Sequence, residues 1–253
     1  MALLGEHNPN RLARPRVRRA LDLLVLAMLS QNTNMANSRS GFKQLRRAFP
    51  TWAGVMNAPI DQVQRHIAVC GLARMRARRL QELLRKIKTQ HRRLDLEFLR
   101  DWEPERAFEY LLGFHGIGPK TAAYTLLFAF DMPVLPVDHG IWRMARRLRL
   151  VRAKAPEPET TRALTRLCAA GQHYPLHVLM FEHAKSHCRP RNPKCRECPL
   201  LGCCPTGKAR DRHRPTEPAT LPPKKVRVAI LARYVSAGIP MNPTEDAEPA
   251  VSR

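Results

Sequence analysis

The chain has 253 residues, a length that can bury a substantial core in one large domain or, as we expect, in two closely packed lobes. Lys and Arg number 44 against 21 Asp and Glu, and the net charge of +23 predicts nucleic acid as the partner, with an acidic membrane surface or charge kept for solubility as alternatives. No apolar run approaches the roughly 20 residues that span a bilayer, which excludes a membrane-spanning protein.

Most of the chain shows the apolar periodicity of helices. The arginine-rich residues 1–19 lack the features of a transit peptide or secretory signal, and we expect a basic arm and helix that pack on the lobe carrying the cysteines. Few later stretches resemble strands, so the predicted fold class is all-α. The predicted helices cover residues 20–30, 42–48, 73–88, 105–112, 120–130, 139–149, 160–169 and 174–186.

The helices are expected to form two lobes followed by a tail. Residues 20–130 form the central lobe, and residues 131–205 form a second lobe that carries the cysteines near its end. Residues 206–253 are basic, rich in Pro, Thr and Ala, and show little periodicity. We expect this tail to be disordered, although residues 226–235 could form one short strand or helix.

Two glycines separate the predicted helices 105–112 and 120–130. Gly116 and Gly118 flank Ile117, and Pro119 then begins an apolar helix, where its missing N–H costs nothing. Free glycine N–H groups at a helix N-terminus can approach a phosphate closely, and the helix dipole adds attraction. The pattern predicts sequence-independent binding of a DNA backbone, or alternatively an ordinary tight turn.

The stretch FHGIGPKTA (114–122) resembles the helix-hairpin-helix of the endonuclease III family. Phe114 and His115 replace the family's Leu and Pro, while both glycines remain. The resemblance implies that Lys120 is the catalytic lysine. It extends over about residues 20–205 and implies a two-lobed DNA glycosylase fold with a cluster loop near its end.

A lysine at this place suits the chemistry of base removal. The amine of Lys120 can attack C1′ of a nucleotide, displace the damaged base and leave a Schiff base that eases β-elimination of the 3′ phosphate. The amine must be neutral to react, and both the helix dipole and burial would favour that form. The alternative is a solvated surface charge.

Asp138 ends an apolar stretch just before a predicted helix. Local sequence predicts a helix N-cap, a role compatible with catalysis. The endonuclease III family has a Val-Asp pair at this interval after the lysine, and the resemblance implies that Asp138 stabilises the cationic sugar and helps to take a proton from the lysine. His139 and Gly140 depart from the usual Thr-His and resemble the adenine glycosylase branch, which lacks the lysine.

Five of the seven cysteines lie between Cys188 and Cys204, which is typical of a metal site in a reducing, intracellular setting. Four of them have the spacing C-x6-C-x2-C-x5-C, which resembles the [4Fe–4S] loop of the family: Cys188, Cys195, Cys198 and Cys204. Zinc sites more often show two close pairs, so we expect the cluster, with zinc or unligated cysteines as alternatives. Spacing alone also allows Cys203 as a ligand, and the family pattern selects Cys204.

Three basic residues lie between the first two of these cysteines: Arg189, Arg191 and Lys194. A loop anchored by a cluster could hold them against DNA phosphates, and the alternative is a solvated basic loop. Cross-linking this loop is a sufficient role for the cluster, without redox chemistry.

Base chemistry requires the target nucleotide to leave the stack. Gln31, after the first predicted helix, resembles the glutamine that the family inserts into the vacated space, with a local cap or turn as the alternative. Leu72 resembles the family's wedge in the opposite strand, with an ordinary core position as the alternative. We interpret the nearby basic run as a solvated helix face with some members near phosphate: Arg74, Arg76, Arg78 and Arg79.

The resemblance implies a bifunctional DNA glycosylase and AP lyase that removes oxidised pyrimidines and cleaves the strand. The expected partner is double-stranded DNA with a damaged base or abasic site, and the expected state is an intracellular, cytoplasmic monomer. The alternatives are a monofunctional glycosylase for mismatched or alkylated bases, and a non-catalytic DNA-binding protein on the same scaffold.

Overall fold

The computed structural model of the chain describes residues 19–169 and 171–211. All the regular elements in these ranges are helices, which confirms the all-α prediction. The described chain divides into two compact units between Met132 and Pro133. Within the described ranges, no helix is both long enough and apolar enough to cross a bilayer. The predicted basic arm and residues 226–235 lie outside the described residues.

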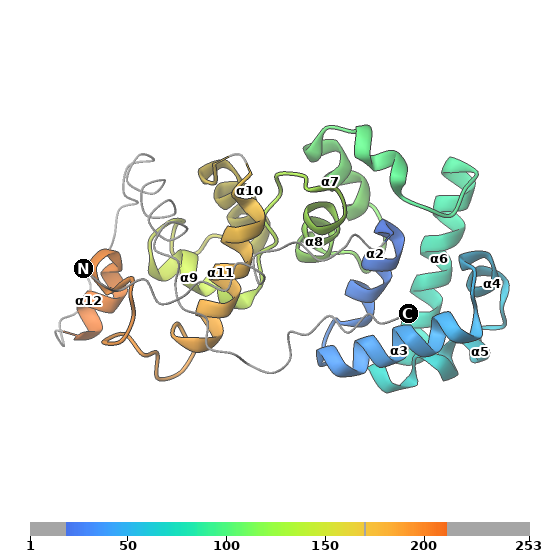
Figure 1. Cartoon of the computed structure of the whole chain (residues 1–253), viewed down its shortest axis with the longest axis horizontal. Coiled ribbons are helices and arrows are strands. Elements are labelled where there is room, and N and C mark those ends of the chain that lie inside the picture. The colour runs from blue at the N-terminus through green and yellow to red at the C-terminus, as the bar shows by residue number, and fades with distance from the viewer. Residues whose placement is uncertain (1–18, 170, 212–253) are drawn as a thin grey trace. The chain divides into compact units, whose positions relative to one another are not determined.

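The unit that ends at Met132 is built around α2, which packs against α8, α3 and α6 (Figure 1). Helix α6 in turn carries α4 and α5, and the core contains the fully buried Leu24, Leu84 and Leu126. The elements are α2 Ala20–Leu29, α3 Met35–Ala48, α4 Trp52–Asn57, α5 Ile60–His66, η1 Ala68–Cys70, α6 Ala73–His91, η2 Glu97–Asp101, α7 Pro104–Leu112 and α8 Pro119–Phe130.

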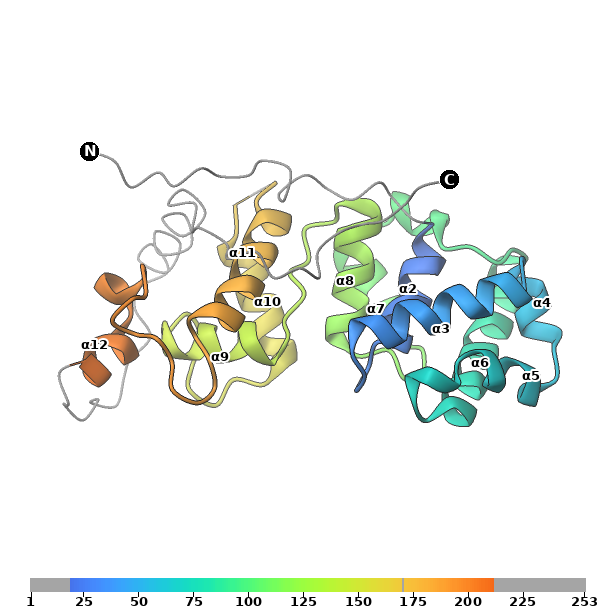
Figure 2. The ribbon, with the colours of Figure 1, turned by 60° about the horizontal axis from the view of Figure 1, so that its bottom comes forward.

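The unit that begins at Pro133 is centred on α9, which packs against α11, α10 and α12 (Figure 2). Its core includes Ile141, Leu164 and Met180, and the cysteine loop packs against that core. The elements are α9 His139–Arg147, α10 Glu157–Leu167, α11 His173–Ser186, η3 Leu201–Cys203 and α12 Pro205–Asp211.

The structure adds helices where apolar periodicity is weak. Helix α3 begins at Met35 rather than residue 42, because Asn34 caps it by accepting a hydrogen bond from the N–H of Asn37. Its buried positions include the small residues Ser38 and Gly41, which give no apolar signal. The short helices α4 and α5 were not predicted, since six or seven residues show less than two full turns of periodicity.

The expectation of disorder from residue 206 is wrong for the beginning of that segment. Helix α12 starts at Pro205, and Thr206 Oγ1 donates to the carbonyl oxygen of Arg147 at 2.9 Å. The N–H of Gly207 donates to Cys204 Sγ at 3.3 Å. These contacts tie the segment to α9 and to the cysteine loop. The tail beyond Asp211 lies outside the described residues.

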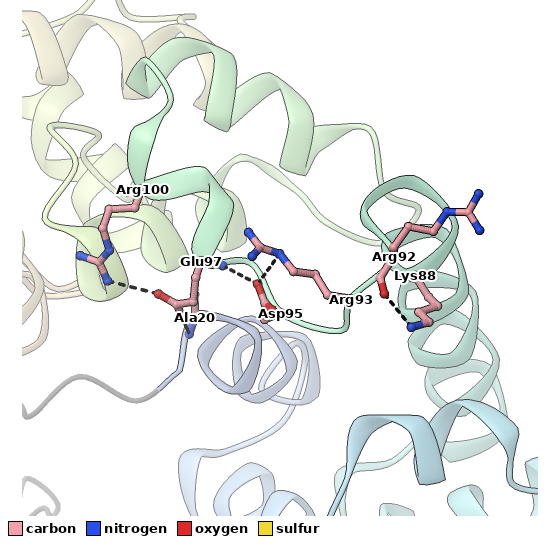
Figure 3. A network of polar contacts seen from close by, with 7 residues as sticks. All are labelled: Ala20, Lys88, Arg92, Arg93, Asp95, Glu97 and Arg100. Atoms are coloured by element: carbon pink, nitrogen blue, oxygen red, sulfur yellow. Dashed lines mark hydrogen bonds and ion pairs between the residues drawn. The ribbon is translucent and has the colours of Figure 1, made fainter.

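Helix α2 has no side-chain cap of its own at its N-terminus, and a distant carboxylate takes that role (Figure 3). Glu97 accepts a hydrogen bond from the N–H of Ala20 at 3.3 Å and forms an ion pair with Arg100 at 3.2 Å. Asp95 accepts from the N–H of Glu97 at 3.0 Å and pairs with Arg93 at 3.2 Å. The start of α2 is thereby fixed to the segment after α6.

Candidate functional site

The turn between α7 and α8 contains the two glycines of the predicted phosphate-binding hairpin. Gly116 has a φ of +86°, a left-handed conformation that favours glycine, and Gly118 is the N-cap of α8 with a φ of −95°. Among the described residues, neither glycine N–H donates a hydrogen bond. Both groups are therefore left for a ligand at the positive end of the α8 dipole.

Helix α6 holds this hairpin in place. Lys86 Nζ donates to the carbonyl oxygen of Gly113 at 2.9 Å and lies 5.0 Å from the centre of the Phe114 ring. Phe114 is buried and packs edge-on against Tyr110, with the ring centroids 5.1 Å apart. The replacement of the family's Leu-Pro thus keeps an apolar anchor at the first position, while His115 at the second is exposed.

Lys120 is the second residue of α8, and its side chain is exposed. Its place in the first helical turn agrees with the expectation from the sequence. The expected burial of this side chain is not seen in the chain without DNA, where it is open to water. Any desolvation of the amine would have to come from a bound nucleotide.

Gln31 follows the C-terminal end of α2 and reaches the hairpin. Its Nε2 donates to the carbonyl oxygen of Gly116 at 2.9 Å and to Oγ1 of Thr121 at 3.4 Å. The side chain therefore does more than close a local turn, since it joins α2 to the hairpin and to α8. Its insertion into DNA stays a prediction, and insertion would require these two bonds to be exchanged.

Leu72 stands at the N-cap of α6 with a φ of +49°, and its residue is 62% exposed. The alternative of an ordinary core residue is therefore excluded. A left-handed conformation costs a leucine free energy, and the exposed side chain recovers none of that cost by burial. Met75, one turn further along α6, is 38% exposed. The wedge role of Leu72 stays a prediction.

The interpretation of the basic run in α6 as a solvated face is wrong for Arg76, which is 7% exposed. Arg76 lies four residues before the buried Leu80, so it belongs to the buried stripe of the helix. The four-residue spacing between Arg76 and Leu80 is the signal in the sequence from which its burial could have been predicted. Burial lowers the pKa of its guanidinium, while the nearby Cys70 acts in the opposite direction.

The guanidinium of Arg76 joins two loops by hydrogen bonds to three carbonyl groups. Its Nε donates to the carbonyl oxygen of Gly71 at 2.8 Å, just before Leu72. Its other two nitrogens donate to Met28, at 2.7 Å, and to Gln31 at the end of α2. The carbonyl oxygen of Gln31, just after α2, thereby gains a partner, and that of Met28, which also accepts from the N–H of Gln31 at 3.4 Å, gains a second.

An open hollow of about 460 Å³ lies between α2, α6 and the hairpin, and we call it the hairpin hollow. Its polar lining consists of Gln31, Asn32, Arg76, Arg79 and Gly116. Its apolar lining consists of Val25, Met28, Leu29, Leu72, Met75 and Leu80. The hollow therefore brings together two residues that the sequence singled out at separate positions, Gln31 and Leu72.

Asp138 lies in the other unit, as the N-cap of α9. Its Oδ1 accepts a hydrogen bond from the N–H of Ile141 at 2.8 Å, which confirms the capping prediction. The carboxylate is half-buried, and the cap uses one of its two oxygens. The next residue, His139, is exposed and pairs through Nδ1 with Glu157 at 2.9 Å.

The cysteine loop surrounds a second open hollow, of about 340 Å³. The four predicted ligands line it, and Cys203 does not: Cys188, Cys195, Cys198 and Cys204. Among the described residues, no three His, Cys, Asp or Glu side chains lie close enough to hold one metal ion. A [4Fe–4S] cluster binds each cysteine through a different iron, so its ligands lie further apart than those of a single zinc ion. The observation that bears on such a group is that all four cysteines line one hollow.

Burial disfavours the thiolate form of two of these cysteines. Burial raises the pKa of Cys198 to about 11, and burial likewise raises the pKa of Cys204. Several thiolates would not persist together here without metal charge to neutralise them. Burial, followed by the neighbouring His187, lowers the pKa of His183 to about 4, and its Nε2 lies 3.5 Å from Cys198 Sγ.

Two arginines of α9 hold the cysteine loop. Arg143 donates to the carbonyl oxygens of Cys188, Ala184 and His139, at 2.8, 3.2 and 3.4 Å. Arg147 donates to Cys188 Sγ at 3.3 Å and to the Arg189 carbonyl at 2.8 Å. The first cysteine and the helix turn after Asp138 are thereby joined through Arg143.

The three basic residues of this loop are exposed: Arg189, Arg191 and Lys194. Arg189 Nε donates to the carbonyl oxygen of Lys185 at 3.3 Å, and Lys194 pairs with Glu197 at 3.3 Å. Exposed pairs of this kind contribute little stability and exchange easily for phosphate. Phosphate contact by the loop stays a prediction.

Comparison with known proteins places these features in a family context. The model of the HhH-GPD superfamily of base excision DNA repair proteins matches residues 25–170. A putative DNA glycosylase of Arabidopsis thaliana is 33% identical over 191 residues, which is 72% of this chain and 65% of the relative. The chain thus spans just under two thirds of that relative. Endonuclease III of Thermotoga maritima is 31% identical over 196 residues, which is 76% of this chain and 87% of the relative.

The fold is similar to that of a trapped covalent intermediate of endonuclease III with DNA containing an estranged adenine. The TM-score is 0.68 at 26% identity, over 81% of this chain and 92% of the other. The similarity confirms both the resemblance to endonuclease III and the predicted helix-hairpin-helix glycosylase fold.

Replacement of the two hairpin glycines by alanine is expected to change the free energy of unfolding by different amounts. In Gly116→Ala the added Cβ would lie 3.1 Å from Cδ of Arg79 in a left-handed backbone, so the free energy of unfolding should fall by about 1–2 kcal/mol. Gly118 has open space around it and a φ of −95°. In Gly118→Ala the loss of a favourable N-cap and the lower entropy of the unfolded chain oppose each other, so the change should stay within about 0.5 kcal/mol.

Urea denaturation of the wild type and both variants measures this difference. Equal destabilisation by the two substitutions would contradict the assigned backbone geometry.

Proposed function

The chain belongs to the HhH-GPD superfamily of base excision DNA repair proteins, and we propose that it is a bifunctional DNA glycosylase and AP lyase. Its proposed substrate is an oxidised pyrimidine in double-stranded DNA. One observation carries the proposal: an exposed lysine, Lys120, follows a glycine hairpin whose two glycine N–H groups donate to no other group in the described part of the chain. The hairpin would hold a phosphate of the strand, and the lysine beside it would meet the sugar.

Lys120 would act as the nucleophile. Its nitrogen forms a bond to C1′, the glycosidic bond breaks, and the base leaves with the bonding electrons. The ring then opens to a Schiff base, loss of a proton from C2′ follows, and the C3′–O bond breaks to release the 3′ phosphate. Contact with a nucleotide would remove water from the exposed amine and favour its neutral form.

Asp138 would serve the same reaction as a fixed negative charge. Its carboxylate is held in one orientation by the cap bond to Ile141, so little reorganisation is needed when positive charge develops on the sugar. The same group could accept the proton that the lysine amine loses.

The duplex would be held open by groups from the hairpin hollow. Gln31 would fill the space left by the target nucleotide, and the exposed Leu72 would replace lost stacking in the opposite strand. Arg189, Arg191 and Lys194 would bind phosphates. Gly116 and Gly118 would contribute backbone contacts that carry no sequence information.

The four cysteines that line the second hollow would hold a [4Fe–4S] cluster. All four line one hollow, as the ligands of a single group would, and burial raises the pKa of Cys198 and Cys204, which disfavours their thiolates in the absence of metal charge. When bound, this group would cross-link residues 188–204 into one rigid loop. The chain's own arginines, Arg143 and Arg147, already orient that loop from α9.

Borohydride trapping tests the role of Lys120. The wild type should become covalently attached to duplex DNA that contains thymine glycol or an abasic site. In Lys120→Gln the adduct should disappear and cleavage should slow by at least about a thousandfold, because the nucleophile is lost. Lys43→Gln removes an exposed lysine from α3 and should behave as the wild type.

Two outcomes would overturn the proposal. Base release without any adduct would indicate a monofunctional glycosylase. Salt-sensitive DNA binding without base release or cleavage across a panel of oxidised, mismatched and alkylated bases would indicate a non-catalytic DNA-binding protein.

Substitutions of Asp138 can separate capping from catalysis. Asparagine caps helices about as well as aspartate, so Asp138→Asn should keep the thermal midpoint while the rate of base release falls by about a hundredfold or more. In Asp138→Ala the rate of base release should fall by the same factor, and the free energy of unfolding should also fall by about 1 kcal/mol because the cap is lost. Single-turnover kinetics and thermal denaturation measure both effects. A fully active Asp138→Asn would leave the residue with its capping role alone.

Iron analysis tests the cluster. The purified wild type should contain iron and absorb broadly in the visible range, and Cys204→Ser should lower the iron content. Cys203→Ser is the matched control and should retain iron, because Cys203 lies outside the lining of the hollow. Zinc in place of iron in the wild type, or equal iron loss in both variants, would contradict the assignment.

A further inference from the structure

One proton transfer in the proposed reaction has no protein group assigned to it. After Lys120 has formed the Schiff base, C2′ must lose a proton before the C3′–O bond can break. C2′ is bonded to C1′, so a base for this step has to stand next to the group that serves C1′. Asp138 is proposed to act beside C1′, and the residue that follows it in the chain is His139.

The side chain of His139 is both oriented and accessible. Its Nδ1 lies 2.9 Å from Oε1 of Glu157, the first residue of α10, and the side chain is 88% exposed. An ionised carboxylate can only accept a hydrogen bond, so Nδ1 is the donor. In the neutral ring Nε2 then carries the lone pair. The contact with Glu157 therefore leaves the other ring nitrogen, Nε2, ready to accept a proton.

The backbone on both sides of this ring is fixed. Asp138 caps α9 through the N–H of Ile141, and Arg143 Nη1 donates to the carbonyl oxygen of His139 at 3.4 Å. The residue after His139 is Gly140, where a Cβ would lie 3.1 Å from Oδ1 of Asp138. A larger residue at position 140 would crowd that carboxylate. Glycine therefore keeps the carboxylate uncrowded at the turn that also carries the histidine.

We propose that His139 is the base that removes the C2′ proton and that Glu157 is its positioning residue. This inference rests on the proposed function, because it requires the Schiff base on Lys120. Nε2 takes the proton, the C–H electrons form the C1′=C2′ bond, and the nitrogen of the Schiff base becomes neutral. The electrons of that double bond then form C2′=C3′, and the C3′–O bond breaks to release the phosphate. The imidazolium gives its proton to water.

The charges around His139 favour this role over a phosphate contact. Glu157 lies within hydrogen-bonding distance of the ring, and Asp138 adds a second carboxylate one residue away. Both negative charges would repel a phosphate brought to the same place. A carboxylate bound to Nδ1 instead stabilises the imidazolium that forms when Nε2 takes a proton.

Single-turnover reactions on a duplex with a preformed abasic site test the role of His139, since they begin after base release. Borohydride trapping measures the Schiff base, and strand cleavage measures elimination. In His139→Gln the Schiff base should form at the wild-type rate, while cleavage should slow by about a hundredfold, the lower end of what a positioned base contributes. The trappable adduct should therefore accumulate. Thermal denaturation checks that the variant is folded.

Chemical rescue separates a lost base from a lost contact. Added imidazole should restore much of the cleavage by His139→Ala, because a free base can then reach C2′. Lys120→Gln in the same buffer gives the rate of cleavage without a Schiff base. His66→Gln is the matched control, since it removes a half-buried histidine of α5 and should cleave as the wild type.

Glu157→Gln tests the positioning role. Its amide can donate to Nδ1 and so hold the ring in the wrong tautomer, which should slow elimination by about tenfold. The rate of Schiff base formation and the thermal midpoint should not change. A residue that only supports the fold would affect both chemical steps together.

Two results would overturn the proposal. Wild-type cleavage by His139→Gln would leave the histidine without a part in elimination. An equal loss of Schiff base formation and cleavage, with weaker binding of the duplex and no rescue by imidazole, would indicate a contact with phosphate. Failure of the proposed function would show separately, as a wild type that forms no adduct with an abasic duplex, and it would remove both proposals.

Discussion

A single buried guanidinium fixes the parts of this site that would contact DNA. Arg76 donates to three carbonyl groups, one before Leu72 and two at the end of α2, where Gln31 follows. Gln31 in turn bonds to the hairpin through the carbonyl oxygen of Gly116. Three segments distant in sequence therefore share one rigid set of hydrogen bonds. Loss of the guanidinium would remove all three hydrogen bonds at once, including the buried one to Met28, which is more costly than the loss of an exposed ion pair.

This arrangement separates two kinds of recognition. Backbone N–H groups of Gly116 and Gly118 suit a phosphate, which is the same in every sequence. Side chains around the hollow, among them Leu72 and Arg79, differ in shape and donors and so can respond to the identity of a base. Both kinds depend on α6, since it carries Leu72 at its start, Arg79 one turn beyond Arg76, and Lys86 against the hairpin.

Sequence patterns predicted the features that depend only on residues close together in the chain. Helical periodicity identified most of the helices, and local residue types identified the glycine turn and the cap at Asp138. The short helices α4 and α5 were not predicted, because six or seven residues are too few to show helical periodicity. The burial of Arg76 was signalled by its spacing to Leu80, but its bond to Met28 and the bond from Gln31 to the hairpin could not be predicted, because these partners lie 48 and 85 residues away. The exposure of Lys120 and Leu72 likewise depends on the packing around them.

In the second unit, arginine hydrogen bonds likewise support the turn that carries Asp138, the carboxylate proposed to act in catalysis. Arg143 bonds to the carbonyl of Cys188 in the loop and to the carbonyl of His139, the residue after Asp138. Close packing supports this turn, because a Cβ on Gly140 would lie 2.8 Å from Cβ of Ala184. A group that stiffens the cysteine loop would therefore also stiffen the turn that orients the Asp138 carboxylate. An entirely structural cluster can thus affect catalysis, since an electrostatic contribution depends on a charge that does not move when the sugar becomes cationic.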